Sequence, residues 1–273
     1  MKILIFLLGM FFMFLIYVYA ENKLLITRKY IIGTNKNPAG KLDIVQISDV
    51  HKKRIASKII SRTKQLEPDA VFLTGDIVSR HETDFSQLDK LLSGLSAICP
   101  VYACIGNHEQ DLSDELMEQY RALMKKYGVC LLENAVTDLH KDGINVKIAG
   151  ASLKHGVYKN PEGGYSDLEQ YTVADLSADI GEKEGCTILL AHNPLCFEAY
   201  SQWGADAVFS GHIHGGSVRI PILGGLLSPE RKFFPKYSKG VYKKGKTTMV
   251  VSGGIGKPRI FNPPEIIYSR INF

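Results

Sequence analysis

Five short clusters of polar residues in this sequence carry side chains that could bind divalent metal ions. They are Asp49-Val50-His51, Gly75-Asp76, Gly106-Asn107-His108-Glu109, His192-Asn193-Pro194 and Gly211-His212-Ile213-His214. Their donors are carboxylate and amide oxygens and imidazole nitrogens, with no thiolate, a set that suits Mn, Fe or Zn. Two Asp, one Asn and four of the His exceed the needs of one ion. The clusters therefore predict a site for two metal ions about 3.5–4 Å apart, which could bind a phosphate and ionise a water.

Each cluster taken alone has an ordinary structural explanation. An Asp-x-His pair is usually a surface pair, and Gly-Asp after a strand is usually a turn. The Gly211 to His214 cluster is more specific, because alternate residues of an extended segment point to opposite sides unless the backbone bends. All five clusters follow apolar, strand-like runs. Open α/β sheets bind ligands beyond the carboxyl ends of their strands, so we expect the clusters to meet in one crevice.

Strands and helices alternate along the chain and must position these clusters. The apolar runs that lead into the clusters span residues 42–48, 70–74, 101–105, 187–190 and 207–210. Helices are predicted over residues 55–66, 85–97, 114–127, 167–179 and 197–203. Hairpin-like strands are predicted over residues 129–132, 136–139, 144–150, 240–251 and 265–271. This order indicates an α/β protein with two mixed sheets packed together and helices outside, in one domain over residues 41–273.

The N-terminus differs from the rest of the chain. Residues 3–20 form an unbroken apolar run, preceded by Lys2. As a helix this run would span about 27 Å, close to the thickness of a bilayer core. We expect an uncleaved single-pass anchor, with a cleaved signal sequence as the alternative, followed by a connecting segment over residues 21–40. Lys2 favours a cytoplasmic N-terminus and an extracytoplasmic domain, although Arg28 and Lys29 weaken the asymmetry.

Composition excludes several classes of protein. The chain has 273 residues, 45% of them hydrophobic and 22% charged, so it can bury a full core and is not disordered. Lys and Arg exceed Asp and Glu by only 33 to 28, and we expect no nucleic-acid partner. The five cysteines lack a CxxC pair, which favours buried free thiols. Nothing indicates an obligate oligomer, and we expect a monomer.

The five clusters together resemble the signature of the calcineurin-like metallophosphoesterases, over the whole domain from about residue 42. Within that superfamily, the segments HGGSVRIPILGGLLSP, FPKYSKGVY, VSGGIG and FNPPEI resemble the membrane-associated bacterial phosphodiesterase branch of the YkuE and YaeI type. The resemblance implies a four-layer αββα sandwich, in agreement with the two mixed sheets expected above. It also implies a metal-dependent phosphoric ester hydrolase.

The resemblance implies a role for each residue. Asp49, His51 and His214 would hold the first metal ion, Asn107, His192 and His212 would hold the second, and Asp76 would bridge the two. His108 would not be a ligand; it would contact the phosphate and either protonate the leaving oxygen or stabilise charge there. A hydroxide that bridges the metals would attack phosphorus in line.

The substrate is less defined by the sequence. Residues 231–246 carry seven Lys or Arg interleaved with aromatic residues, either as a solvated loop or as a rim that lies against anionic lipid. With the anchor, this favours a lipid-linked or cell-envelope phosphate ester. Members of this branch and neighbouring lipid A enzymes cleave the pyrophosphate of UDP-2,3-diacylglucosamine, but no residue here identifies a uridine or acyl pocket. A tethered hydrolase of soluble nucleotides or phosphoproteins is the alternative, and a non-catalytic metal-binding module is disfavoured because every ligand is present.

Overall fold

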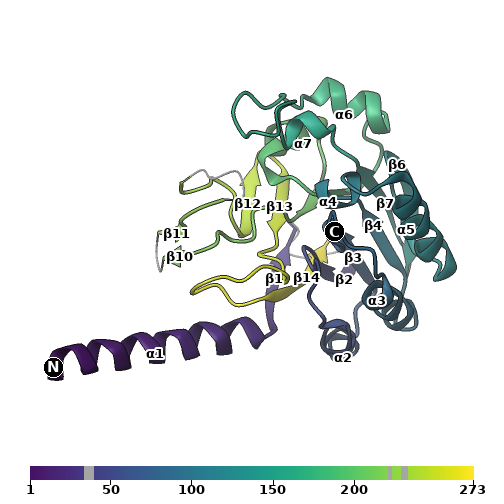
Figure 1. Cartoon of the computed structure of the whole chain (residues 1–273). Coiled ribbons are helices and arrows are strands. Elements are labelled where there is room, and N and C mark those ends of the chain that lie inside the picture. Colours follow the sequence, from purple (N-terminus) through teal and green to yellow (C-terminus); the bar gives the residue numbers. More distant parts are fainter. Residues whose placement is uncertain (34–39, 221–222, 229–232) are drawn as a thin grey trace.

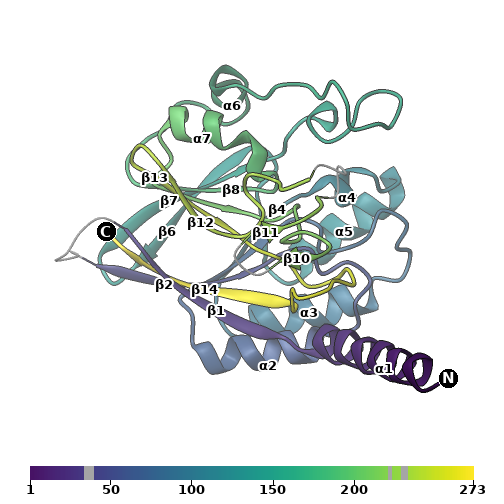
Figure 2. The same ribbon diagram turned by 90° about the vertical axis from the view of Figure 1, so that its left-hand side faces the viewer.

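The computed structural model describes residues 1–33, 40–220, 223–228 and 233–273. Two six-stranded sheets pack face to face, and helices cover the outer face of each (Figures 1 and 2). This is the four-layer αββα sandwich expected from the sequence, and both sheets are mixed.

The first sheet has the strand order β1-β14-β2-β3-β4-β5. Its strands are β1 (Ile26–Ile32), β14 (Glu265–Asn272), β2 (Lys41–Ile47), β3 (Ala70–Thr74), β4 (Val101–Cys104) and β5 (Cys130–Leu131). Strands β2 to β5 are parallel, and β14 runs antiparallel to β2 but parallel to β1. Helices α2 (Ala56–Leu66), α3 (Ser86–Ser96) and α5 (Asp114–Lys126) cover its outer face.

The second sheet has the strand order β12-β13-β9-β8-β7-β6. Its strands are β12 (Gly240–Lys244), β13 (Thr247–Val251), β9 (Ala207–Ser210), β8 (Thr187–Ala191), β7 (Ile144–Ala151) and β6 (Ala135–Lys141). The four inner strands are parallel, and the two edge strands are antiparallel to their neighbours. Helices α6 (Val173–Ile180) and α7 (Phe197–Trp203) cover its outer face. The short elements are helices α4 (Asn107–Gln110), η1 (His155–Val157) and η2 (Pro194–Cys196), and the strand pair β10 (Arg219–Ile220) and β11 (Gly224–Gly225).

The inner strands are apolar on both faces because each face meets another layer. In β3, Val71 and Leu73 pack in the cluster under the helices, whereas Phe72 packs between the sheets. The rings of Phe72 and Phe209 lie 5.2 Å apart across the two sheets. This explains why these strands are continuous apolar runs and lack polar alternation.

Four parts of the fold differ from the sequence-based expectation. The hairpin strand expected over residues 129–132 is instead β5, which pairs in parallel with β4. Strand β1 lies within residues 21–40, which were expected only to connect the anchor to the domain, and it pairs with β14. Strand β14 was expected in a hairpin but inserts between β1 and β2. Helix α6 begins at Val173 and not near residue 167, because Thr172 and Asp175 form a capping box at its start.

Helix α1 (Lys2–Lys23) extends away from the domain (Figure 1). It has 22 residues and is long and apolar enough to cross a membrane, and none of its most apolar window is buried against the domain. A length of 22 residues corresponds to about 33 Å of helix, close to the thickness of a bilayer core.

Candidate metal centre

The five predicted clusters meet at one edge of the sandwich, where β2, β3, β4, β8 and β9 end. Their loops are joined by backbone hydrogen bonds. Asp49 N–H donates to the Gly75 carbonyl (3.0 Å), and His51 N–H donates to the Asp76 carbonyl (3.2 Å). Gly211 N–H donates to the His192 carbonyl (3.0 Å), and these contacts fix the loops relative to one another.

The backbone is left-handed at five predicted ligands. The φ angles are +52° at Asp49, +52° at His51, +53° at Asp76, +69° at His212 and +56° at His214. Non-glycine residues adopt this region at a cost of about 1–3 kcal/mol each, and such residues gather at functional sites. The bend expected within the Gly211 to His214 cluster is therefore present, and it turns both histidines toward the same centre.

Two of the glycines permit this geometry in different ways. Gly75 has a φ of +82° and makes the sharp turn before Asp76. Gly106 is extended, but a Cβ there would lie 2.4 Å from Asp76 Oδ1. Gly106 is therefore needed for space and not for a left-handed turn.

The ligand atoms fall into two groups that share one end of the crevice. Asp49, His51 and His214 form one group, and Asp76, His192 and His212 form the other, with the ligand atoms of each within 4.8 Å of one another. His51, Asp76 and His108 meet the same criterion and link the two groups. His192 Nε2 lies 3.3 Å from Asp76 Oδ2 and 3.9 Å from Asp49 Oδ1, so the groups are adjacent. Asn107, at the start of α4, lines the same cavity as Asp76 and His212.

Buried ligand atoms without hydrogen-bond partners show that this site fits cations. Among the described residues, these atoms include both ring nitrogens of His51, Asn107 Oδ1, His192 Nε2 and His214 Nδ1. Leaving a buried polar atom unpaired costs about 1–3 kcal/mol. Four of these atoms, one from each residue, are explained if they coordinate metal ions, and the donor set of oxygen and imidazole nitrogen suits divalent metals.

The protonation of the histidines agrees with this. Burial lowers the pKa of His51 and holds that of His214 well below its usual range, so both are neutral and able to bind a metal. Although burial opposes the charged form of His192, the carboxylates of Asp76 and Asp49 raise its pKa to about 10. The two carboxylates thus create a field that favours a positive charge between them, and a divalent cation would supply it.

His108 is held in one tautomer by the neighbouring loop. The backbone N–H of Arg80 donates to His108 Nδ1 (3.2 Å), which leaves the proton of a neutral ring on Nε2. Burial lowers the pKa of His108 to about 3, although Asp76 acts in the opposite direction. His108 Nε2–H therefore faces the cavity as a neutral hydrogen-bond donor.

Above the ligands, a cavity of about 110 Å³ reaches Asp76, Asn107, His108, His212 and His214. Its rim carries the basic residues Arg80, Lys159 and Lys257, together with Tyr165, and the buried Tyr158 lines its interior. Asp111 pairs with Arg80 (3.1 Å) and with Lys159 (3.0 Å), so in the part of the chain that the structure describes Lys257 is the rim cation without an ion pair. Ligand pockets for whole small molecules are typically about 300–1,000 Å³. This cavity therefore accommodates a small anionic group, and the remainder of a larger molecule would lie on the basic rim.

The comparison with known proteins decides the family. Residues 42–216 match the calcineurin-like phosphoesterase family. The chain belongs to that family. Phosphodiesterase YaeI of Escherichia coli is 25% identical over 228 residues, which cover 81% of this chain and 77% of YaeI. UDP-2,3-diacylglucosamine pyrophosphatase LpxG of Chlamydia muridarum is 24% identical over 279 residues, covering 84% and 83% of the two chains. The structure of TT1561 of Thermus thermophilus is 12% identical, covers 79% of this chain and 91% of that chain, and shares the fold with a TM-score of 0.51.

In this phosphoesterase a buried glutamate, Glu109, links two loops of the metal centre. The residue is part of the sequence motif, but the sequence did not indicate its role. Glu109 is fully buried and accepts four backbone N–H bonds, from Asp76 (2.8 Å), Ile77 (2.7 Å), Val78 (3.1 Å) and Gly106 (2.8 Å). The four donors favour its ionised form, whereas burial and Asp76 oppose it and raise its pKa to about 7. Glu109 therefore joins the loop of Asp76 to the loop of Asn107 and His108.

Replacing Glu109 with glutamine is expected to lower the free energy of unfolding by about 3 kcal/mol or more, because the amide NH₂ would face two buried N–H donors. Urea denaturation measures this, with the exposed Glu118→Gln on α5 as the matched control. A difference from the control within about 0.5 kcal/mol would show that Glu109 is not an ionised clamp.

The remaining histidines lie outside the metal centre of this phosphoesterase. His155 is exposed near the rim and pairs with Asp111 (2.8 Å). His81 is exposed, and its carbonyl accepts from Lys52 Nζ (3.3 Å); His140 is exposed on β6. The rim residues Arg80, Lys159 and Lys257 were missed by the sequence analysis, and their only signal is a basic residue on a loop that follows a strand.

The basic segment 231–246 does not form one surface, which corrects the expected rim. Residues 231–232 lie outside the described residues. Lys239 is buried and pairs with Glu265 (2.7 Å), and burial lowers its pKa to about 8. Lys244 pairs with Glu198, and Lys246 lines a cavity at the opposite end of the sheets. Lys243 is exposed on β12, and the exposed Lys236 is close in sequence to the exposed Phe233 and Phe234.

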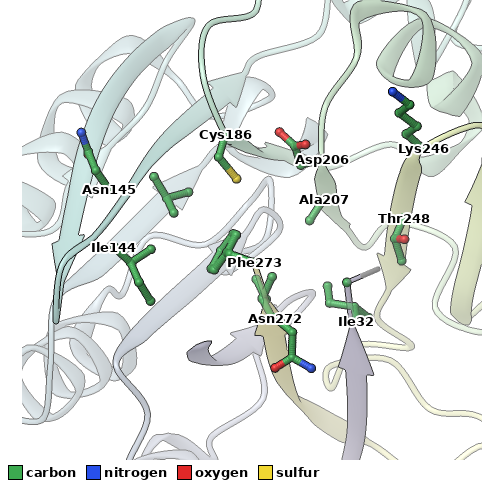
Figure 3. Close-up of a pocket in the computed structure, with 13 residues that line it drawn as sticks. Ile32, Ile144, Asn145, Cys186, Asp206, Ala207, Lys246, Thr248, Asn272 and Phe273 are labelled. Carbon is green, nitrogen blue, oxygen red and sulfur yellow. The ribbon is translucent and has the colours of Figure 1, made fainter. Parts of the chain in front are cut away.

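A larger cavity of about 540 Å³ lies at that opposite end (Figure 3). It is lined by Ile144, Cys186, Asp206 and Lys246, near the amino ends of β7, β8, β9 and β13, and by the terminal Phe273. The clusters able to hold a metal among the described residues all lie at the other end. Size alone therefore does not identify the site of this phosphoesterase.

Proposed function

We propose that this chain is a membrane-anchored phosphoesterase that uses two divalent metal ions to hydrolyse a phosphodiester or pyrophosphate bond of a lipid-linked or cell-envelope substrate. The observation that carries this proposal is the pair of adjacent ligand groups with unpaired buried donor atoms. Phosphomonoesters are the simpler substrates that the same centre would accept.

The proposed ligands divide between the two ions. Asp49, His51 and His214 would hold one, Asn107, His192 and His212 would hold the other, and Asp76 would contribute to both. The ions would be Mn, Fe or Zn, because the donors are oxygen and imidazole nitrogen without thiolate. When bound, such a pair neutralises phosphoryl charge and lowers the pKa of a water.

The other residues of the chain bind and orient the substrate. Arg80, Lys159 and Lys257 attract the anionic group to the cavity. His108 donates its Nε2–H to an oxygen of the phosphoryl group or of the leaving group, because Arg80 N–H holds the opposite nitrogen. Of its two expected roles, stabilising charge therefore suits the geometry better than transferring a proton from an imidazolium.

The lipid part of the proposal is supported by the anchor, the small cavity and the relatives. Only a phosphoryl group fits within about 110 Å³, so acyl chains would stay outside the cavity. YaeI is named a phosphodiesterase and LpxG a pyrophosphatase of UDP-2,3-diacylglucosamine. The anchor would be single-pass, with Lys2 keeping the N-terminus in the cytoplasm and the domain of the monomer outside.

Metal removal tests the activity directly. The full chain, stripped with a chelator, is expected to lose all hydrolysis of bis-p-nitrophenyl phosphate and to regain it with Mn²⁺ at two bound equivalents per chain. Absorbance gives turnover and plasma emission spectrometry gives the metal content. Undiminished hydrolysis after stripping, or two bound metals without turnover of diester, monoester or pyrophosphate, would contradict the proposal.

A further inference from the structure

The end of helix α1 is fastened to the loop between β13 and β14. The Asn22 side chain donates to the Arg259 carbonyl (2.7 Å) and accepts from the Arg259 N–H (3.0 Å). Lys53 Nζ donates to the carbonyls of Asn22 (2.9 Å) and Ile255 (3.0 Å). Helix α1 therefore leaves the domain in a direction that this loop defines.

Phe261 lies beside the helix some distance from its end. Its ring is 6.3 Å from that of Phe14 and 5.6 Å from that of Tyr17. About 14 Å of helix axis separates Phe14 from Lys23. Since α1 is only about as long as a bilayer core is thick, a membrane that holds α1 also reaches Phe261.

The exposed phenylalanines of the domain lie on the same side as α1, whereas the exposed Ile31, Val136 and Val241 lie on strands β1, β6 and β12. Outside α1, the exposed phenylalanines of the described residues are Phe233 (70% exposed), Phe234 (54%) and Phe261 (46%). Leu223 near β11 is 64% exposed. The β10–β11 region and the loop after β13 both extend on the side of α1 (Figure 1), and in Figure 2 that loop lies along α1. Phe234 and Phe261 are left-handed, with φ of +49° and +56°, so the fold maintains these exposed rings at a cost.

The loop that carries Phe261 also reaches the metal centre. The Asn262 side chain donates to the carbonyl of His214 (2.7 Å), and the buried Arg259 guanidinium donates to the carbonyls of Gly253 and Gly254. Lys257, on the same loop, lines the cavity above the ligands. The rim of the cavity and the aromatic tip therefore belong to one short segment, residues 257–262.

We propose that residues 257–262, together with Leu223, Phe233 and Phe234, form a surface that inserts into the leaflet crossed by the end of α1, with the Phe261 ring below the headgroups. This surface places the cavity at the lipid–water boundary, where phosphoester bonds of anionic lipid headgroups enter it without leaving the membrane. The inference rests on the proposed anchoring by α1 and adds the orientation of the domain. The exposed Lys257 and Lys236 match an anionic surface better than a neutral one.

Tryptophan scanning of the full chain in vesicles tests the surface without using activity. The native Trp203 is buried and donates to the Gly181 carbonyl (2.8 Å), so it gives a constant background. In phosphatidylcholine–phosphatidylglycerol vesicles, lipids brominated on the acyl chains are expected to quench the added emission of Phe261→Trp and Phe233→Trp by about half or more. The emission of Val136→Trp, at a 40% exposed position on β6, should be unchanged.

Three results would overturn the inference. If the chain floats with the vesicles but Phe261→Trp is quenched no more than Val136→Trp, the anchor stands and the surface does not insert. If Phe261→Trp is shielded from both brominated lipid and aqueous acrylamide, a second copy of the chain or another protein covers it. If the chain does not float at all, the anchoring fails, and the orientation fails with it.

A kinetic test separates the surface from the metal centre. Phe261→Ser and Phe233→Ser are expected to raise KM about tenfold for p-nitrophenyl hexadecyl phosphate in vesicles, while kcat/KM for soluble p-nitrophenyl methyl phosphate stays unchanged. Val136→Ser should change neither value. Equal losses on both substrates would show that the phenylalanines support the fold, which overturns the inference. Absence of metal-dependent turnover of either ester by the unaltered chain would contradict the proposed function and leave the quenching result standing.

Discussion

Replacing Asp76 with asparagine is expected to reduce turnover at least about 1000-fold, equivalent to about 4 kcal/mol of transition-state stabilisation. Asp76 Oδ1 accepts a hydrogen bond from the backbone N–H of His108 (2.8 Å), and Asp76 Oδ2 lies 3.3 Å from His192 Nε2. Burial alone would raise the pKa of Asp76, but the charge of His192 and its side-chain hydrogen bond hold it well below its usual range, so it is a carboxylate. An amide NH₂ in place of one oxygen can neither bind a cation nor serve two ions at once.

Bound metal should fall from two equivalents to one or fewer in the same variant. Metal analysis after equilibration with Mn²⁺, together with turnover of bis-p-nitrophenyl phosphate, measures both effects. Asp138→Asn on β6 is the matched control, since its half-exposed carboxylate lies 3.8 Å from Lys147 on the far side of the second sheet from the centre. Asp76→Asn with two metals and full activity would contradict the assigned ligand role.

The convergence of the site could be predicted because it follows from strand order. Asp49 and His214 are far apart in sequence, yet His214 Nδ1 lies 3.6 Å from Asp49 Oδ1. Asp49 follows a strand of the first sheet and His214 follows a strand of the second sheet. The packing of the two sheets places the carboxyl ends of these strands close together. Short apolar runs ending in ligand-type residues therefore contained most of the required information.

The backbone conformations at the site could not be predicted from local sequence. Left-handed φ angles are uncommon outside glycine, and although Asp and His adopt them more often than most residues, nothing in the local sequence marks the five ligands that adopt them here. These angles are maintained by contacts distant in the chain, such as the His212 N–H donating to Asp49 Oδ1 (3.1 Å). The role of Glu109 could not be predicted for the same reason, because its four N–H donors come from two loops that are distant in the sequence.

Residues 231–246 do not form the basic rim that was one of their two expected roles, and the reason is related. A run of lysines looks like one surface in sequence, but β12 and the turn after it carry Lys246 to the opposite end of the sheet. Lys239 is neutralised by Glu265, on strand β14, whose position beside β1 and β2 was also not predicted. Long-range strand pairing and buried ion pairs leave no periodic signal in the sequence near them.

Replacing His108 with alanine is expected to reduce kcat about 100- to 1000-fold while both metal ions remain bound. The ligands of the proposed ions are unchanged, whereas the cavity loses the Nε2–H that Arg80 N–H directs into it. Turnover of bis-p-nitrophenyl phosphate with parallel metal analysis measures this, and the exposed His140→Ala should behave as the unaltered chain. Loss of metal in His108→Ala would instead identify His108 as a ligand, which its proximity to His51 and Asp76 would allow.

The pH dependence of that loss distinguishes the two roles of His108. Burial lowers its pKa to about 3, so the ring is neutral from about pH 6 to pH 9 and its Nε2–H is present throughout. The ratio of kcat for the unaltered chain to kcat for His108→Ala should therefore stay constant over this range. A general acid that acts as imidazolium would give a ratio that falls as the pH rises through its pKa. His108→Gln retains an N–H donor near the position of Nε2, so its kcat should be about tenfold higher than that of His108→Ala. Hydrogen bonding to developing charge needs a donor and not a titrating ring.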